Sequence, residues 1–245
     1  MKKEILSKQK LEDCEKNKTM KLSIKEGGYA SVASGLTSEY VTPFALVLKA
    51  NNSQIGFLSS LVGIISPIAQ IFGSRLMEKY PRKKLIVLFV TLQALMWLPI
   101  ALLSLLFWKN ILLNYLPIIL IAFYGLYAVF GALAGPAWFS LMGDIVPEKI
   151  RGKYFGGRSK ICGFIALVSA ITASFFLDYF KTKGLVLLGF ATFFILATIF
   201  RLLSANSFKK HYDPKFRLKD GYYFSFFDFV KKAPSNNFGR FVISW

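Results

Sequence analysis

One carboxylate of this sequence, Glu39, is predicted to lie inside hydrocarbon. It falls near the middle of an apolar segment that covers about residues 28–48. An ionised group at that depth is costly unless it faces a cavity or a partner. Ser38 and Thr42 accompany it in a stripe of small polar residues at helical spacing. We therefore expect a substrate- or proton-binding carboxylate. The alternatives are a hydrogen bond to a neighbouring helix, or a position nearer the outer interface.

A later apolar segment adds two aromatic hydroxyls, Tyr124 and Tyr127. Gly125, Gly131 and Gly135 on the same segment would let another helix approach closely. We expect both tyrosines to line the cavity with the carboxylate of the first segment. The same residues would also suit plain helix packing.

Charged residues in two hydrophilic connections suggest an ionic gate. One connection carries Glu78, Arg82 and Lys83, and the other carries Asp144 and Arg151. Carboxylates and basic groups on adjacent loops can pair when one mouth of a transporter is closed and separate when it opens, which biases a two-state equilibrium. The sequence thus predicts a cytoplasmic gate. The alternative is a set of solvated basic loops, since exposed ion pairs contribute little.

The elements that must position these residues are membrane-spanning helices. Apolar residues make up 54% of the 245, charged residues only 18%, and the mean hydropathy is +0.47. Apolar runs of about 20 residues are long enough to cross a bilayer core, and backbone amides in lipid need the internal partners that a helix supplies. Six such spans are predicted, at about residues 28–48, 54–77, 85–108, 113–141, 161–179 and 184–203.

The basic residues predict how these spans are oriented. The net charge is +18, but the 31 lysines and arginines alternate between sparse and dense connections instead of forming one face, which argues against nucleic-acid binding. The four predicted to be on the outer side are Lys49, Lys109, Lys181 and Lys183. By the positive-inside rule, both ends of the chain face the cytoplasm. We expect a multi-pass protein of the cell membrane.

Four regions follow from this pattern. Residues 1–25 form a charged cytoplasmic tail, and residues 26–204 form a six-helix transmembrane bundle. Residues 205–237 form a cytoplasmic loop that contains an interfacial helix at about 222–232. Residues 238–245 begin a seventh helix that is too short to cross.

Residues 74–84 resemble a degenerate form of the major facilitator superfamily signature between helices two and three, G-x-L-x-D-R-x-G-R-[KR]. Glu78 takes the acidic position, and Arg82 and Lys83 take the later basic pair. Serine and proline stand at its two glycine positions. Residues 135–153 are similar to the connection between helices four and five of that family, with its Pro-Glu-x-x-Arg-Gly turn.

The resemblance covers about residues 27–245 and implies an all-α fold, the N-terminal half of a family with two six-helix bundles. Each half would be two three-helix inverted repeats, with substrate bound between the halves. The resemblance implies secondary transport of a small solute by alternating access. The alternative is a truncated or half-transporter that is inactive alone and acts as an assembly partner for a second six-helix half or another copy of the chain. The helix-four arginine and the helix-five glycine-proline signature of the family have no counterpart here, so proton coupling and drug/proton antiport are not implied.

Other classes fit less well. An intramembrane protease needs a Ser/His dyad or paired aspartates within the spans, whereas the only histidine, His211, falls in a predicted loop. No P-loop motif occurs. Cys14 and Cys162 lack metal-ligand spacing. We expect no catalytic residues, metal or cofactor; the expected partners are a small-molecule substrate and the lipid bilayer.

Overall fold

The computed structural model describes the backbone of residues 2–214 and the side chains of residues 11–214. The predicted interfacial helix at 222–232 and the predicted start of a seventh helix at 238–245 lie outside the described residues. Within them, the chain is helical and contains no strand.

The helices, in chain order, are α1 (Lys2–Thr37), α2 (Val41–Val47), α3 (Asn52–Lys79), α4 (Arg82–Leu95), α5 (Trp97–Trp108), α6 (Leu116–Ile145), the short 3-10 helix η1 (Glu148–Ile150), α7 (Arg151–Thr182) and α8 (Val186–Phe208). Five helical stretches of the described residues are long and apolar enough to cross a membrane: α3, α4 with α5, α6, η1 with α7, and α8. These helices make the protein an all-α membrane protein, as predicted.

The first predicted span differs from expectation. It is not among the five stretches, because the helix is interrupted by a turn at residues 38–40. Pro43 explains the interruption: it lacks an amide hydrogen, and its ring clashes with the carbonyl of the residue four positions earlier, Glu39. On the other side of the turn, α1 continues without a break across the predicted boundary at residue 25. The segment predicted to be a separate tail is therefore helical from Lys2 onward.

The other prolines act unequally. Pro99 breaks the third predicted span, since α4 ends at Leu95, four positions before it, and α5 follows. Pro67 and Pro136 instead lie inside continuous helices, α3 and α6. Proline is tolerated in such helices where neighbouring groups satisfy the freed carbonyl.

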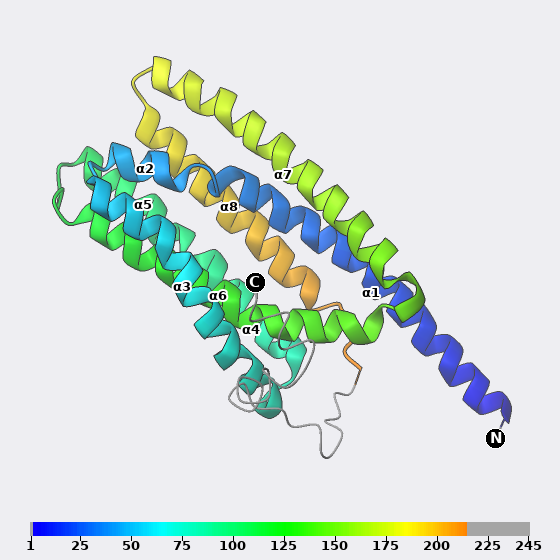
Figure 1. Ribbon diagram of the computed structural model, residues 1–245. Coiled ribbons are helices and arrows are strands. Elements are labelled where there is room, and N and C mark those ends of the chain that lie inside the picture. Colours follow the sequence, from blue (N-terminus) through cyan, green and yellow to red (C-terminus); the bar gives the residue numbers. More distant parts are fainter. Residues whose placement is uncertain (1, 215–245) are drawn as a thin grey trace, which may run out of the picture. The chain divides into compact units, whose positions relative to one another are not determined.

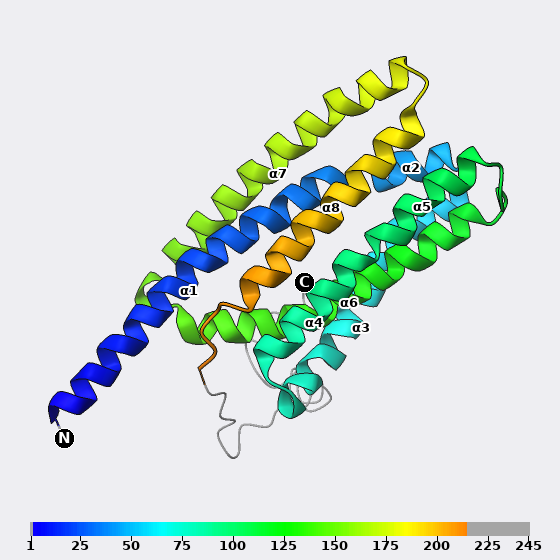
Figure 2. The ribbon, with the colours of Figure 1, turned by 180° about the vertical axis from the view of Figure 1, so that it is seen from behind.

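The helices pack in two groups. In the first, α1 lies against α7 and α8; in the second, α6 lies against α3 and α4. Helix α8 also contacts α4 and α5, and so joins the two groups, which both ribbon views show (Figures 1 and 2). Each group therefore combines helices from the first and second halves of the bundle sequence.

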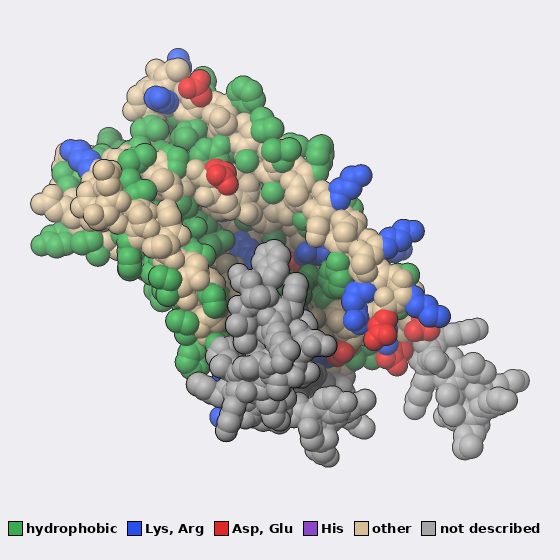
Figure 3. Space-filling view, viewed as in Figure 1, with side chains coloured by type: hydrophobic (Ala, Val, Ile, Leu, Met, Phe, Trp, Pro, Cys, Tyr) green, Lys and Arg blue, Asp and Glu red, His purple; other side chains and the backbone are tan. Residues whose placement is uncertain are grey.

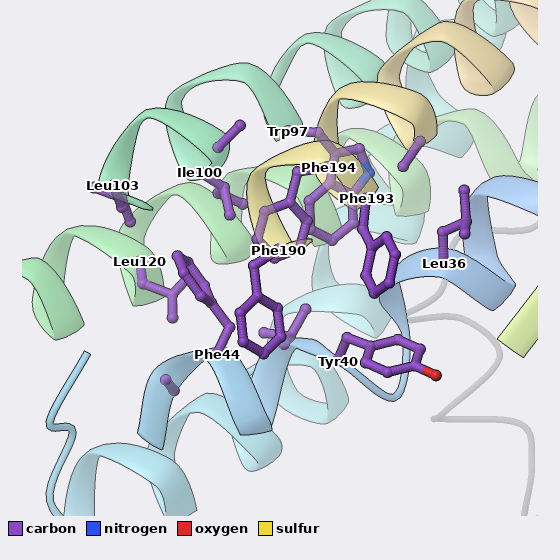
Figure 4. Close-up of a cluster of buried hydrophobic side chains, with 14 of the residues drawn as sticks. Leu36, Tyr40, Phe44, Trp97, Ile100, Leu103, Leu120, Phe190, Phe193 and Phe194 are labelled. Carbon is purple, nitrogen blue, oxygen red and sulfur yellow. The ribbon is translucent and has the colours of Figure 1, made fainter. Parts of the chain in front are cut away.

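An aromatic core joins the groups where α2, α5 and α8 meet (Figure 4). The Phe44 ring lies 5.0 Å from that of Phe194, measured between centroids, and the Trp97 ring stacks on Phe194 at 5.3 Å and 3°. All three side chains are buried. Offset and edge-to-face ring contacts add to the stabilisation from apolar burial. This core fixes the helices around the polar interior described next.

Candidate functional site

The predicted carboxylate Glu39 lies in the turn between α1 and α2 and is exposed, as is Ser38. The Ser38 hydroxyl lies 2.9 Å from that of Ser34, one turn earlier. Thr42 is half-buried in the first turn of α2. The helix break thus places Glu39 on the surface of the described residues, whereas a continuous helix had been expected.

The two predicted tyrosines lie together on α6. Their rings stack at 5.7 Å and 9°, and the Tyr127 ring also lies 4.6 Å from that of Trp97. Tyr124 is close enough to Glu39 to interact with it electrostatically, and Tyr127 is close enough to Arg201 to do the same. The structure therefore connects three of the predicted cavity residues, and leads from them to a basic residue that was not predicted.

A carboxylate of α1, Glu26, is buried between the helices. Its side chain is 2% exposed. Arg158 donates to one of its oxygens, from Nη2 to Oε1 at 2.7 Å, and the Ser204 hydroxyl donates to the other at 3.2 Å. The Arg158 guanidinium also lies 4.7 Å from the centre of the Trp138 ring, a cation–π contact. These contacts join α1, α6, α7 and α8 through charged groups.

A second guanidinium, Arg201 of α8, is half-buried beside this pair. It donates from Nε and Nη2 to the Gln93 side-chain oxygen, at 3.0 and 2.7 Å, and from Nη1 to the Ser204 hydroxyl at 3.4 Å. Both acceptors are neutral. The described side chains place no carboxylate within ion-pair distance of Arg201.

A cavity of about 220 Å³ opens onto these groups. Its lining combines Glu26, Arg158 and Arg201 with small and apolar residues of α4 and α6. Figure 3 shows basic side chains recessed in a hollow bordered by hydrophobic ones on the face drawn. Because charged groups are rare inside membrane bundles and mark substrate or ion pathways, we take this cavity as the candidate site.

The residues of the predicted gate divide into those that interact and those that do not. Arg82, only 1% exposed, forms an ion pair with Asp144 at 2.6 Å and lies 3.6 Å from Asp213. This joins the start of α4 to the end of α6. Glu78 is exposed, and no basic group of the described residues lies within ion-pair distance of it.

The other two gate candidates bind backbone oxygens. Arg151 donates to the Gly143 carbonyl at 2.8 Å, and Lys83 Nζ donates to the His211 carbonyl at 2.8 Å. Of the four charged residues expected to pair at the gate, Arg82 and Asp144 are in contact, whereas the described contacts give Glu78 and Arg151 no ionic partner. The gating role itself stays a prediction.

His211, after the end of α8, is buried next to these gate residues, with 2% of its surface exposed. Burial, together with the positive charges of Lys83 and Arg158, lowers the pKa of His211 from 6.5 to about 4. The imidazole is therefore neutral at physiological pH.

The ionic network of Glu26, Arg158 and Arg201 was missed because both arginines were counted with hydrophilic connections and Glu26 lies just before the predicted first span. One signal was present in the sequence. Thr19, Ser23, Glu26, Ala33 and Thr37 follow one another at spacings of four, three, seven and four residues and are all buried, on one face of α1. A helix that keeps small and polar residues on a single face is typical of close packing in membranes, and Glu26 lies on that face.

Comparison with known proteins agrees with the sequence motifs. The family model of the Major Facilitator Superfamily matches residues 28–241. Searches of curated proteins and of solved structures gave no match. The match covers all the apolar helices described above, which fit a multi-pass membrane protein. With most of its length matched by that model, the chain belongs to the Major Facilitator Superfamily, whose members carry out transport across membranes.

Proposed function

We propose that the chain takes part in the transport of a small solute by alternating access, as a secondary transporter. The observation that carries this proposal is the cavity of about 220 Å³ with three charged side chains inside a bundle of apolar helices. Charged groups in such a place cost free energy. Their presence therefore favours a pathway for a polar solute over a role in helix packing.

The parts of the site would act at different depths. Arg201 and Arg158 would contact the solute, while Tyr127, Tyr124 and Glu39 continue the polar surface toward the turn between α1 and α2. At the other end, the ion pair of Arg82 with Asp144 would stabilise the state in which that mouth is closed. Breaking the pair shifts the equilibrium between states without creating either one.

We further propose the cell membrane as the location, with the N-terminus in the cytoplasm. The first crossing would then consist of the end of α1 together with α2. The two pieces, from about residue 26 to Val47, cover a helical length of roughly 30 Å, which matches the hydrocarbon core.

The test is the accessibility of the cavity from both faces of a membrane. Ala30 lines the cavity, whereas Ala137 is fully buried in the packing of α6. In a background with Cys14 and Cys162 replaced by serine, A30C should react with a membrane-impermeant maleimide in both right-side-out and inside-out vesicles. A137C should react in neither. Labelling of A30C from a single face, under every solute condition, would contradict alternating access.

A second candidate function is that of a half-transporter that works only as part of an assembly. The observation that favours it is the exposure of Glu39 and Ser38 on the proposed first crossing. A carboxylate facing lipid at such a depth is unfavourable, so a second six-helix half or another copy of the chain would cover it. Crosslinking of E39C in native membranes should then trap a larger species. Only monomer at every crosslinker length would argue against an assembly.

A further inference from the structure

We propose that the cavity between α1, α4, α6, α7 and α8 binds a small organic monoanion, with its negative group on the Arg201 guanidinium. This proposal names a substrate class for the proposed function. It rests on that function only where it identifies the anion as the transported solute. Binding itself is argued and tested independently of transport.

The charges of the cavity lining do not balance. Glu26 is held by Arg158 at 2.7 Å, which makes a neutral pair. The second guanidinium, Arg201, has only the amide oxygen of Gln93 and the hydroxyl of Ser204 as hydrogen-bond acceptors among the described side chains. The lining therefore carries one positive charge in excess. A charge buried without a counterion is costly, and a bound anion of single charge would remove that cost.

The geometry suits a carboxylate or a similar planar anion. Guanidinium groups bind such anions through two parallel N–H donors, which an ammonium group cannot do. Gln93 accepts one N–H from Nε and one from Nη2, and Ser204 accepts one from Nη1. Of the five N–H groups of the guanidinium, one on Nη1 and one on Nη2 therefore remain for a ligand. Arg201 is among the residues that line the cavity. The guanidinium is thus held in place by a neutral group while its charge stays available to a ligand.

The remaining walls select an apolar body. Ile86, Val90, Ala134 and Phe208 line the cavity, and the Trp138 ring lies beside Arg158. At about 220 Å³ the space is smaller than the roughly 300–1,000 Å³ of sites for drug-sized ligands. We therefore expect the occupant to be a small carboxylate with a hydrocarbon or aromatic portion.

Three aromatic compounds of nearly equal shape provide the test. Benzoate, benzamide and benzamidinium differ mainly in charge, being negative, neutral and positive. Binding of radiolabelled benzoate to the purified chain in detergent should be saturable, and unlabelled benzoate should compete at least roughly ten-fold better than benzamide. Benzamidinium should not compete. Isobutyrate and isobutyramide give a second pair of different shape. If neither carboxylate binds, or if each amide competes as well as its acid, the proposal is wrong.

Variants of the cavity separate anion binding from a structural role. R201Q should remove the preference for benzoate over benzamide, while R75Q, the same change at an exposed position near the end of α3, should keep it. R201K keeps the charge without the planar donors and should retain part of the preference. E26Q removes a competing carboxylate and should tighten benzoate binding several-fold, whereas a purely structural network would only be weakened by it. Weaker binding by folded E26Q would overturn the proposal, even if R201Q fails to fold.

The outcomes for binding and for transport are distinct. If binding is charge-selective but the cavity is labelled from one face only, the anion site is supported and the proposed transport is contradicted. If the cavity is labelled from both faces but binding is not charge-selective, the proposed transport is supported and the anion site is contradicted.

Discussion

At the scale of single residues, the enclosed arginines differ in what neutralises them. Arg82 has two carboxylates within 4 Å, at 2.6 Å (Asp144) and 3.6 Å (Asp213), whereas Arg201 has only neutral acceptors among the described residues. The first arrangement stabilises one conformation, because the charge of the guanidinium is neutralised within the protein. The second leaves charge available for a ligand, which is why only the second was considered a binding group.

The Arg82–Asp144 contact predicts a cost for removing its carboxylate. D144A should lower the free energy of unfolding by roughly 1.5–3 kcal/mol, the range for hydrogen bonds to charged groups, because the guanidinium is buried. E78Q, at an exposed acid with no basic partner among the described residues, should change it by less than about 0.5 kcal/mol. Thermal unfolding of the detergent-solubilised proteins measures both. Equal effects would mean that the contact contributes nothing specific.

His211 predicts a dependence of stability on pH. Its pKa is about 4 in the folded protein and 6.5 as the ordinary value, so between these values the unfolded chain binds a proton that the folded chain does not. Stability should therefore fall as the pH drops below about 6.5, by about 2 kcal/mol at pH 5. H211Q cannot bind this proton and should lose that part of the slope. Unfolding temperatures of both proteins between pH 7.5 and 5 check this; parallel curves would refute it.

Most of the residue-level detail could not be predicted from the sequence. Glu39 and the tyrosines were selected by depth along an apolar run, but depth does not report burial, and the turn before Pro43 exposes Glu39. Glu26 lies two residues before the predicted span 28–48, and Arg201 lies two residues before the end of the predicted span 184–203, so both look like charges at a span boundary. Their contacts, Glu26 with Arg158 and Arg201 with Gln93, join positions 132 and 108 residues apart. Such pairs depend on how distant helices pack, which hydropathy does not encode.

At the scale of elements, the locations of the helices were largely predictable because each must cover the hydrocarbon thickness. The predicted span 54–77 corresponds to α3, and the predicted span 184–203 to α8. The ends were less predictable. Helix α7 begins at Arg151, ten residues before the predicted start at 161, because its first turns are basic and carry no hydropathy signal. The six-helix count is not confirmed, since the first span does not qualify as one continuous apolar helix.

The crossing of α3 and α6 predicts the effect of a methyl group at one glycine. A Cβ at Gly73 would lie 2.6 Å from the carbonyl oxygen of Leu133, a distance that forces the backbones apart. We expect G73A to lower the free energy of unfolding by about 1–3 kcal/mol, as overpacking does. Gly63 on the same helix has open space around it. G63A should therefore cause no loss, because alanine is the better helix former.

The measurement is the unfolding temperature of each variant in the same detergent. Matched losses for G73A and G63A would show that the helices adjust freely and that the close approach of α3 to α6 is not required for stability.

At the scale of the whole bundle, the burial of Arg158 and Arg201 modifies the charge argument used for orientation. Both were counted as basic residues of inner connections, yet both belong to a network inside the bundle. A guanidinium that is enclosed between helices and hydrogen-bonded to protein groups does not interact with the membrane surface as a loop lysine does. The orientation must therefore depend on the exposed lysines and arginines, which still lie mainly in the same connections.

This leads to a prediction about the two sides of the membrane. Lys84, at the start of α4, and Lys183, between α7 and α8, are both exposed. Each connection is separated from the next one along the chain by one crossing of the membrane, so the two lysines should lie on opposite sides. In the cysteine-free background, K183C should react with an impermeant maleimide in intact cells, and K84C should react only after the membrane is permeabilised. The reason is that the connection of Lys84 keeps Lys79 and Lys83 although Arg82 is buried, whereas the connection of Lys183 has only Lys181 beside it. The opposite pattern would reverse the orientation while leaving the fold unchanged. Labelling of both positions from one side would require one of the crossings between α4 and α8 to be abandoned, and with it the arrangement that encloses the charged cavity.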